Sequence, residues 1–210
     1  MHILDIHTHC TEATEALISV DPRRFDPQPG LWYSVGYHPW DNVDELGDND
    51  FALLEQCALH PQVLAVGETG MDRLRGADLS VQETVFARHL QLAADLGKPV
   101  IVHCVRAAQD ILAARHRAGL DAVPMIIHGL RSNEHVARAL LDAGCYLSYG
   151  IRFNPAALRI TPLDRLLIET DDALDATIHD VALAVATALD RPIDTVTKTA
   201  AGNAQRLLMK

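Results

Sequence analysis

The sequence predicts an α/β fold with eight parallel strands, and three observations support this. Short apolar, β-branched runs alternate with longer stretches that have the periodicity of amphipathic helices. There are eight such runs, the strand count of a (β/α)₈ barrel. Histidines and carboxylates recur directly after these runs, at the strand ends where such barrels build their sites. Together they predict a TIM-type (β/α)₈ barrel.

The eight strands are expected, in chain order, at residues 3–7, 16–20, 31–37, 63–67, 99–103, 124–128, 145–149 and 165–169. Amphipathic helices are expected at 80–96, 106–118 and 133–143. Two connections break this pattern. Residues 10–15 are too few for a crossover helix, and residues 21–30 contain three prolines. We therefore expect a somewhat trimmed barrel, with loops in place of the early helices.

Composition narrows the class of protein. The chain has 210 residues, 49% of them hydrophobic and 22% charged, as in ordinary globular domains. No apolar run approaches the roughly 20 residues that span a bilayer, and no signal peptide is recognisable, so we expect a cytoplasmic protein with no membrane partner. The four cysteines lack C-x-x-C spacing and are expected to be reduced thiols. A net charge of −10 argues against wrapping nucleic acid with the whole surface.

Metal binding is suggested first by His7 and His9. Residues i and i+2 share one face of a strand, so both imidazoles can face one cation. The alternative, one buried and one exposed histidine, is equally compatible with this pair taken alone. Elsewhere, His38, Glu68, His103, His128 and Asp171 each lie at the C-terminal end of a different predicted strand. The other histidines are expected to be solvated or capping residues: His2, His60, His89, His116, His135 and His179.

The number of candidate ligands indicates two ions. A tetrahedral site usually takes about three protein ligands and a water. The candidates exceed that number: His7, His9, His103, His128, Glu68 and Asp171. Two ions about 3.5–4 Å apart can clamp an attacking and a leaving oxygen. Glu68, on a strand between the two histidine groups, is the natural bridge.

An ordered set of motifs extends over nearly the whole chain: His7-x-His9, Gly36-x-His38-Pro39, Gly67-Glu68-x-Gly70-Met71-Asp72, Pro99-Val100-x-Val102-His103-Cys104, Ile127-His128, Ile168-Glu169-Thr170-Asp171 and Asn203-x-x-Arg206-Leu207. This set resembles the TatD-type metal-dependent deoxyribonuclease family. The resemblance implies a TIM-type barrel and divalent-metal-dependent hydrolysis of nucleic-acid phosphodiesters.

The resemblance also implies roles for these residues. One metal would be held by His7, His9, Glu68 and Asp171, and the second by Glu68, His103 and His128. Asp171 would also orient the attacking water and accept its proton. The cofactors are then two divalent ions, with Mg, Mn and Zn all left open.

Arginines follow four of the predicted strands: Arg73, Arg75, Arg106, Arg131 and Arg152. They predict a positively charged mouth for phosphates, although each could instead solvate a helix start or pair with an aspartate. Substrate contacts are expected from His38, Arg106, Arg152 and Trp40. Trp40 could stack on a base or simply pack at the rim. The chain departs from the family pattern in two loops. Asp172-Ala173-Leu174 follows Glu169-Thr170-Asp171, where the family commonly has a proline and an aromatic residue. Arg106 lies one position later than the arginine of the family's usual H-x-R motif.

Two further carboxylates share strand faces with the candidate ligands. Asp5 alternates with His7, and Glu169 with Asp171. Buried carboxylates need hydrogen-bond donors, so we expect both residues to fix the tautomers of ligand histidines.

The expected function is that of an enzyme, a metal-dependent hydrolase acting on ester bonds, most simply a deoxyribonuclease of single-stranded DNA or DNA ends. One alternative is an amidohydrolase-type barrel enzyme acting on a small-molecule amide, lactone or phosphoester. Many such enzymes bridge their metals with a modified strand lysine, and none of Lys98, Lys198 and Lys210 ends a predicted strand. A second alternative is a non-catalytic metal-binding scaffold. Residues 1–210 are expected to form a single hydrolase barrel domain. The sequence leaves its oligomeric state open.

Overall fold

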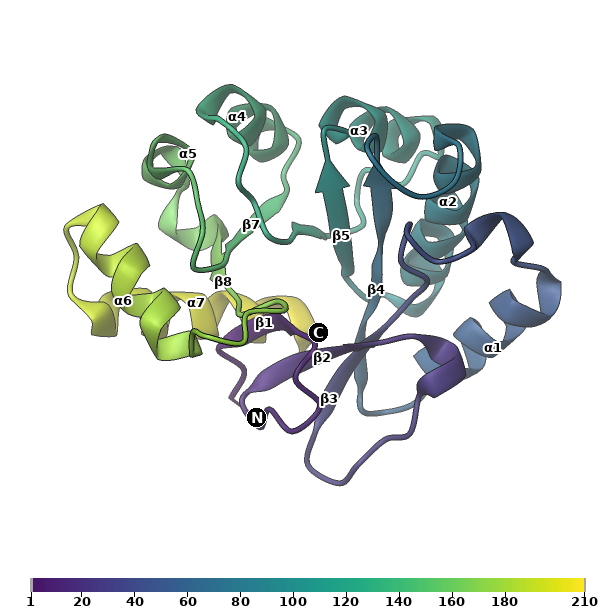
Figure 1. Cartoon of the computed structure of the whole chain (residues 1–210), viewed down its shortest axis with the longest axis horizontal. Coiled ribbons are helices and arrows are strands. Elements are labelled where there is room, and N and C mark those ends of the chain that lie inside the picture. Colours follow the sequence, from purple (N-terminus) through teal and green to yellow (C-terminus); the bar gives the residue numbers. More distant parts are fainter. Residues whose placement is uncertain (1, 210) are drawn as a thin grey trace.

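The computed structural model describes residues 2–209, within which eight strands close into one parallel barrel (Figure 1). They are β1 (Asp5–Thr8), β2 (Ala16–Val20), β3 (Trp32–Val35), β4 (Val63–Asp72), β5 (Val100–Val105), β6 (Met125–Ile127), β7 (Tyr146–Tyr149) and β8 (Leu166–Ile168). Each strand pairs with the next, and β8 returns to β1 with Ile168 opposite Asp5. The predicted barrel is confirmed.

Helices surround the barrel on its outer side (Figure 1). They are α1 (Asp48–Ala58), α2 (Leu79–Leu96), α3 (Ala108–Arg117), α4 (Glu134–Asp142), α5 (Pro155–Ile160), α6 (Ile178–Leu189) and α7 (Ile193–Leu208). None of these helices is long and apolar enough to cross a membrane. No α-helix joins β1 to β2 or β2 to β3, where the described chain has only a loop and the short 3₁₀ turn Pro22–Arg24. The expected trimming is confirmed.

The strand alternation separates the barrel interior from the layer under the helices. On β5, Val100 and Val102 pack in the large cluster that includes residues of α2 and α3, whereas Ile101 packs with Ile126 of β6 in a second cluster. His103 and His128 follow Ile101 and Ile126 by two residues, so they share the face of these apolar residues. The imidazoles therefore lie at the end of the barrel above an apolar interior.

His89 corrects one expectation. It was expected to be solvated or to cap a helix, but it is fully buried on α2. Its Nε2 accepts from the Tyr37 N–H at 3.0 Å and its Nδ1 donates to the Val85 carbonyl at 2.8 Å. The α2 periodicity places it on the same face as Phe86 and Leu90, a signal in the sequence that the prediction missed. Burial, together with the charge of Arg88, lowers the pKa of His89 to about 4.

This depressed pKa predicts a loss of stability in acid. Neutral His89 stabilises the fold fully above its unfolded pKa of about 6.5, and this stabilisation is lost as the pH falls toward 4. The loss between pH 7 and pH 4 should be about 3 kcal/mol. We expect the free energy of unfolding of His89→Gln, measured by urea denaturation without metal, to fall less over this range than that of the wild type. Parallel curves would contradict the assignment.

Candidate metal centre

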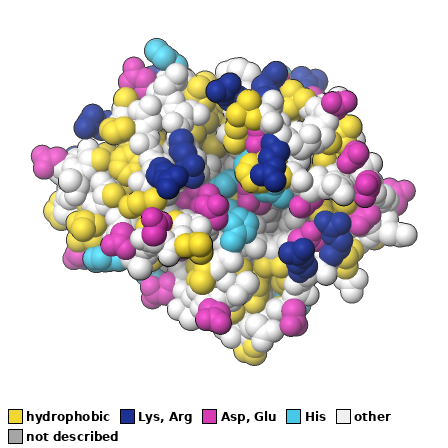
Figure 2. Space-filling model, in the orientation of Figure 1, with side chains coloured by type: hydrophobic (Ala, Val, Ile, Leu, Met, Phe, Trp, Pro, Cys, Tyr) yellow, Lys and Arg dark blue, Asp and Glu magenta, His cyan; other side chains and the backbone are white. Residues whose placement is uncertain are grey.

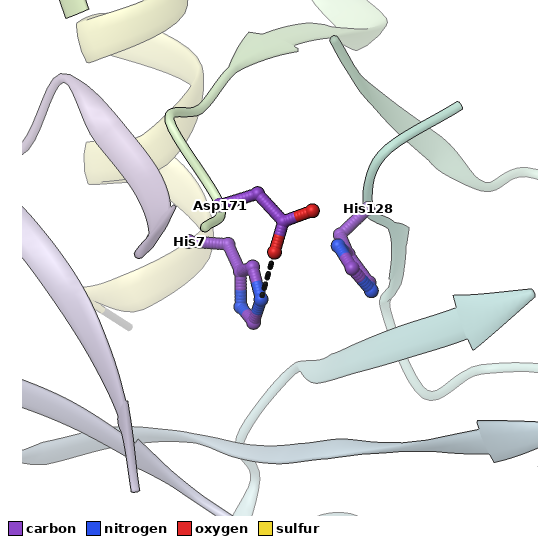
Figure 3. A group of neighbouring side chains, drawn as sticks. All are labelled: His7, His128 and Asp171. Carbon is purple, nitrogen blue, oxygen red and sulfur yellow. Dashed lines mark ion pairs between the residues drawn. The ribbon is translucent and has the colours of Figure 1, made fainter. Parts of the chain in front are cut away.

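The candidate ligands converge at the carboxyl ends of the strands. His7 belongs to β1, Glu68 to β4 and His103 to β5. His9 and His128 directly follow β1 and β6, and Asp171 lies three residues after β8. Figure 2 shows histidine side chains in a central hollow of the molecule, with acidic and basic side chains around it. In Figure 3, His7, His128 and Asp171 approach one another from three separate segments. The topology thus brings together residues more than 160 positions apart.

Glu68 lies at the centre of the cluster and is 4% exposed. Its two carboxylate oxygens face different histidines. Oε2 lies 3.2 Å from Nε2 of His7 and 3.5 Å from Nε2 of His9. Oε1 lies 2.7–2.9 Å from one ring nitrogen of each of three other imidazoles: His38, His103 and His128. One carboxylate therefore joins two groups of histidines, as a bridging ligand must.

Asp171 completes the group around His7 and His9. Its Oδ1 lies 3.6 Å from Nε2 of His7 and 3.7 Å from Nε2 of His9. Its backbone adopts a φ of +56°, a left-handed conformation that, glycine apart, occurs occasionally for Asp and Asn. Two backbone hydrogen bonds hold it there: Asp171 N–H donates to the His7 carbonyl, and its own carbonyl accepts from His9 N–H. The backbone thus aims this carboxylate at the cluster.

Two buried carboxylates contact the imidazoles of candidate ligands on the side away from Glu68. Glu169 Oε1 lies 3.3 Å from Nδ1 of His128, and Asp72 Oδ2 lies 3.2 Å from Nε2 of His103. Each contact engages the ring nitrogen opposite the one that faces Glu68. The expected contact of Glu169 with a candidate-ligand histidine is present. Asp72 was missed in this role, although its position four residues after Glu68 on β4 was a signal that the two share a strand face.

The expectation for Asp5 was wrong. Its carboxylate contacts no imidazole among the described residues and accepts instead from the N–H groups of His7 and Thr170 and from the Thr170 hydroxyl, at 2.6–3.3 Å. The reason is the strand register. Asp5 pairs with Ile168 of β8, so the chain just beyond β8 supplies the nearest donors. Asp5 therefore ties β1 to the segment that carries Asp171.

His7 provides the test of whether a cation fits this centre. It is fully buried, and within residues 2–209 neither of its ring nitrogens has a hydrogen-bond partner. Burial and the charge of His128 lower its pKa, but Glu68 and Asp171 overcome both and raise the pKa to about 9. An imidazole nitrogen that faces two carboxylates without hydrogen bonds is suited to share a cation with them.

Three overlapping groups have ligand atoms within 4.8 Å of one another and could hold a metal: His7 with His128 and Asp171, His7 with His9 and Glu68, and His38 with Glu68 and His103. The six residues predicted as ligands are all in this cluster. His38, predicted as a substrate contact, lies with them, since its Nε2 is 2.9 Å from Glu68 Oε1. The G-x-H-P motif indicated that His38 is a site residue, but it did not indicate where the side chain points.

The remaining predicted substrate residues lie beside the cluster. Trp40 is 42% exposed, its indole N–H donates to Asp72 Oδ2 at 2.7 Å, and the Arg75 guanidinium lies 4.0 Å from its ring centroid. Its ring edge is thus linked through Asp72 to His103.

A cavity of about 730 Å³ opens next to the candidate ligands, mainly between the loops that follow β5 to β8. Arg106 and Arg152, both predicted as substrate contacts, line it together with Arg131. Arg73 does not, because it forms a two-point ion pair with Asp110 at 2.7 and 2.8 Å. Asp172 and Asp175 bring negative charge to the same rim. The cavity therefore offers both charge signs within reach of the cluster.

Fold and site together define a TIM-barrel protein with a candidate metal centre of histidines and carboxylates. The family described as TatD related DNase matches residues 23–209. The chain belongs to this family.

Individual relatives agree with this assignment. The chain is 32% identical over 149 residues to "Uncharacterized metal-dependent hydrolase YabD" of Bacillus subtilis, covering 67% of this chain and 58% of that protein. It is 37% identical over 153 residues to "3'-5' ssDNA/RNA exonuclease TatD" of Cronobacter turicensis, covering 68% and 57%. The chain thus spans less than two thirds of these curated relatives. The solved structure of YjjV, a TatD homolog from Escherichia coli, has the same fold, with a TM-score of 0.83 at 19% identity over 98% of this chain and 97% of that one.

Proposed function

We propose that the chain is a divalent-metal-dependent hydrolase that cleaves phosphodiester bonds in nucleic acid, with single-stranded DNA or DNA ends as substrate. The position of Glu68 carries the proposal, because its two oxygens face two separate groups of histidines. The names of two relatives, a metal-dependent hydrolase and a single-strand exonuclease, support the reaction and the substrate. Residues 1–210 act in this proposal as a single domain.

Two ions would be held on either side of Glu68. His7, His9 and Asp171 would hold one, and His103 and His128, with His38 beside them, would hold the other. When bound, such ions neutralise phosphate charge and lower the pKa of a water ligand to about 7. Imidazole-rich groups suit Zn, whereas Mg and Mn prefer oxygen ligands.

Asp171 is the proposed proton acceptor. Burial raises the pKa of Asp171, but the contact with His7 and the charges of His128 and His7 outweigh burial and lower the pKa below its usual value. The group is therefore a carboxylate at neutral pH. Its Oδ1 faces His7 and His9, which leaves Oδ2 for the attacking water. As the water oxygen bonds to phosphorus and the bond to the leaving oxygen breaks, the water proton passes to Asp171.

Substrate binding is assigned to the cavity beside the centre. Arg106 and Arg152 are exposed on its lining and would bind phosphates along the strand, and the exposed part of Trp40 would contact a base. The net charge of −10 restricts favourable contact with a polyanion to this mouth.

The proposal is tested with end-labelled single-stranded DNA. Purified protein is incubated with Mg²⁺, Mn²⁺ or Zn²⁺, beside bis(p-nitrophenyl) phosphate, a lactone and a panel of dipeptides. We expect metal-dependent release of short products from the DNA, hydrolysis of the phosphate diester and no action on the peptides. Chelation by EDTA should abolish both reactions. Cleavage of a lactone or peptide without cleavage of either phosphodiester would overturn the proposal in favour of the small-molecule alternative.

A further inference from the structure

We propose that Arg131 is a catalytic residue whose guanidinium binds a non-bridging oxygen of the phosphoryl group at the metal centre. The inference rests on the proposed function and deepens it. Arg131 lies in the loop between β6 and α4, three residues after His128. The sequence placed it only among the general arginines of the rim.

Distance to the cluster singles out Arg131. Its Nη2 lies 4.0 Å from Asp171 Oδ2, the carboxylate oxygen that is not the one nearest His7 and His9. Among the arginines that line the cavity within residues 2–209, it alone forms an ion pair with a candidate metal ligand. It therefore stands at the boundary between the cluster and the cavity, where a bound phosphate would enter.

The guanidinium has its donors available. The Arg131 side chain is 59% exposed, and at 4.0 Å its pairing with Asp171 is too long for a hydrogen bond. No hydrogen bond of its guanidinium is found within the described residues. Arg115 provides the contrast, because its guanidinium is buried and donates to several backbone carbonyls. Arg131 thus keeps a planar pair of N–H groups for two-point binding of a phosphate.

The backbone around Arg131 is fixed on both sides. Leu130 is 2% exposed, and its N–H donates to the Ser148 carbonyl at 3.0 Å. Asn133 caps α4, accepting from the Val136 N–H at 3.1 Å. Gly129 adopts a φ of +56° and passes close to Asp171 Oδ2, which an added Cβ would meet at 4.0 Å. The loop is thereby held near the cluster, and only the arginine side chain needs to move.

A cation at this position has a specific task in phosphodiester hydrolysis. Negative charge on the phosphoryl oxygens must be balanced in the transition state. Positive groups stabilise the transition state most when they are already positioned before the reaction. The carboxylates of Glu68 and Asp171 lie in the cluster, where they would repel an incoming phosphate. Arg131 offsets this repulsion on the cavity side and forms or breaks no covalent bond.

The first test measures phosphate binding without turnover. Inorganic phosphate is titrated by calorimetry into the Mn²⁺-loaded wild type, Arg131→Ala and the control Arg138→Ala, whose residue is exposed on α4 and does not line the cavity. We expect binding to weaken by about 10- to 100-fold in R131A, the loss of one charge-assisted contact, and to stay unchanged in R138A. Equal phosphate binding by R131A and the wild type would overturn the proposal.

The second test separates catalysis from structure. With bis(p-nitrophenyl) phosphate, kcat should fall about 10²- to 10³-fold in R131A and less in Arg131→Lys, with Mn²⁺ affinity unchanged. Added guanidinium at non-denaturing concentration should restore part of kcat in R131A and leave R138A unaffected. Recovery of R131A by excess Mn²⁺ alone would instead mean that Arg131 only supports Asp171 and would overturn the proposal. A wild type that binds phosphate through Arg131 but cleaves no phosphodiester would contradict the proposed function and the catalytic role of Arg131, and would support only its contact with phosphate.

Discussion

Glu68→Gln is expected to lower phosphodiester hydrolysis by at least about 1,000-fold. The substitution keeps the shape of the side chain but removes the charge that would hold two cations close together. It also places an amide among imidazole nitrogens that now lie 2.7–3.5 Å from carboxylate oxygens. The measurement is kcat with bis(p-nitrophenyl) phosphate at saturating Mn²⁺.

The fold should survive this change, because it rests on the apolar clusters of the barrel and not on the charge of one carboxylate. Circular dichroism and thermal unfolding of the variant provide the check. Glu55→Gln is the matched control, since Glu55 is exposed on α1, away from the cluster. A folded E68Q protein with wild-type turnover would mean that the chemistry lies elsewhere.

Asp171→Asn is expected to lower kcat by about 10²- to 10⁴-fold, the usual contribution of a general base. Asparagine fits the same left-handed backbone but cannot take the proton of the attacking water. The group on the other oxygen of Glu68, which includes His103 and His128, does not contain Asp171. One ion should therefore remain bound to D171N.

Activity and metal content of D171N are measured together. Asp194→Asn serves as the control, because Asp194 is exposed and pairs with Lys198 on α7. Retention of wild-type kcat in D171N would show that another group accepts the proton. Loss of all bound metal would show that the ligands form one unit instead of two groups.

Much of this account follows from the sequence because strand periodicity and strand ends are local features. The apolar runs located every strand of the barrel. The shortness of residues 10–15 and the prolines at 22, 27 and 29 correctly indicated that the first two helices are missing. The extent of β4 was underestimated. It continues through Thr69 and Gly70 to Asp72, because these residues pair with β5 although they lack an apolar pattern. Only glycine fits at position 70, where a Cβ would lie 2.1 Å from the His103 carbonyl.

The orientation of individual side chains could not be predicted from the sequence. The position of His38 after β3 is compatible with a substrate contact and with a metal ligand. Its Nε2 faces Glu68 because of tertiary packing, which the sequence does not show. The same holds for Asp5, whose role depended on the register between β1 and β8. No local pattern connects Arg73 with Asp110 or Arg131 with Asp171, because each pair joins residues from separate segments of the chain.

We propose that the Glu68 carboxylate joins two cation sites, and the number of divalent ions per chain tests this most directly. Wild type and Glu68→Gln are saturated with Mn²⁺ or Zn²⁺, freed of excess metal by rapid gel filtration and analysed by elemental analysis against protein concentration. We expect about two ions per wild-type chain and at most about one in E68Q. A wild type that saturates at one ion, or an E68Q protein that still holds two, would contradict this proposal.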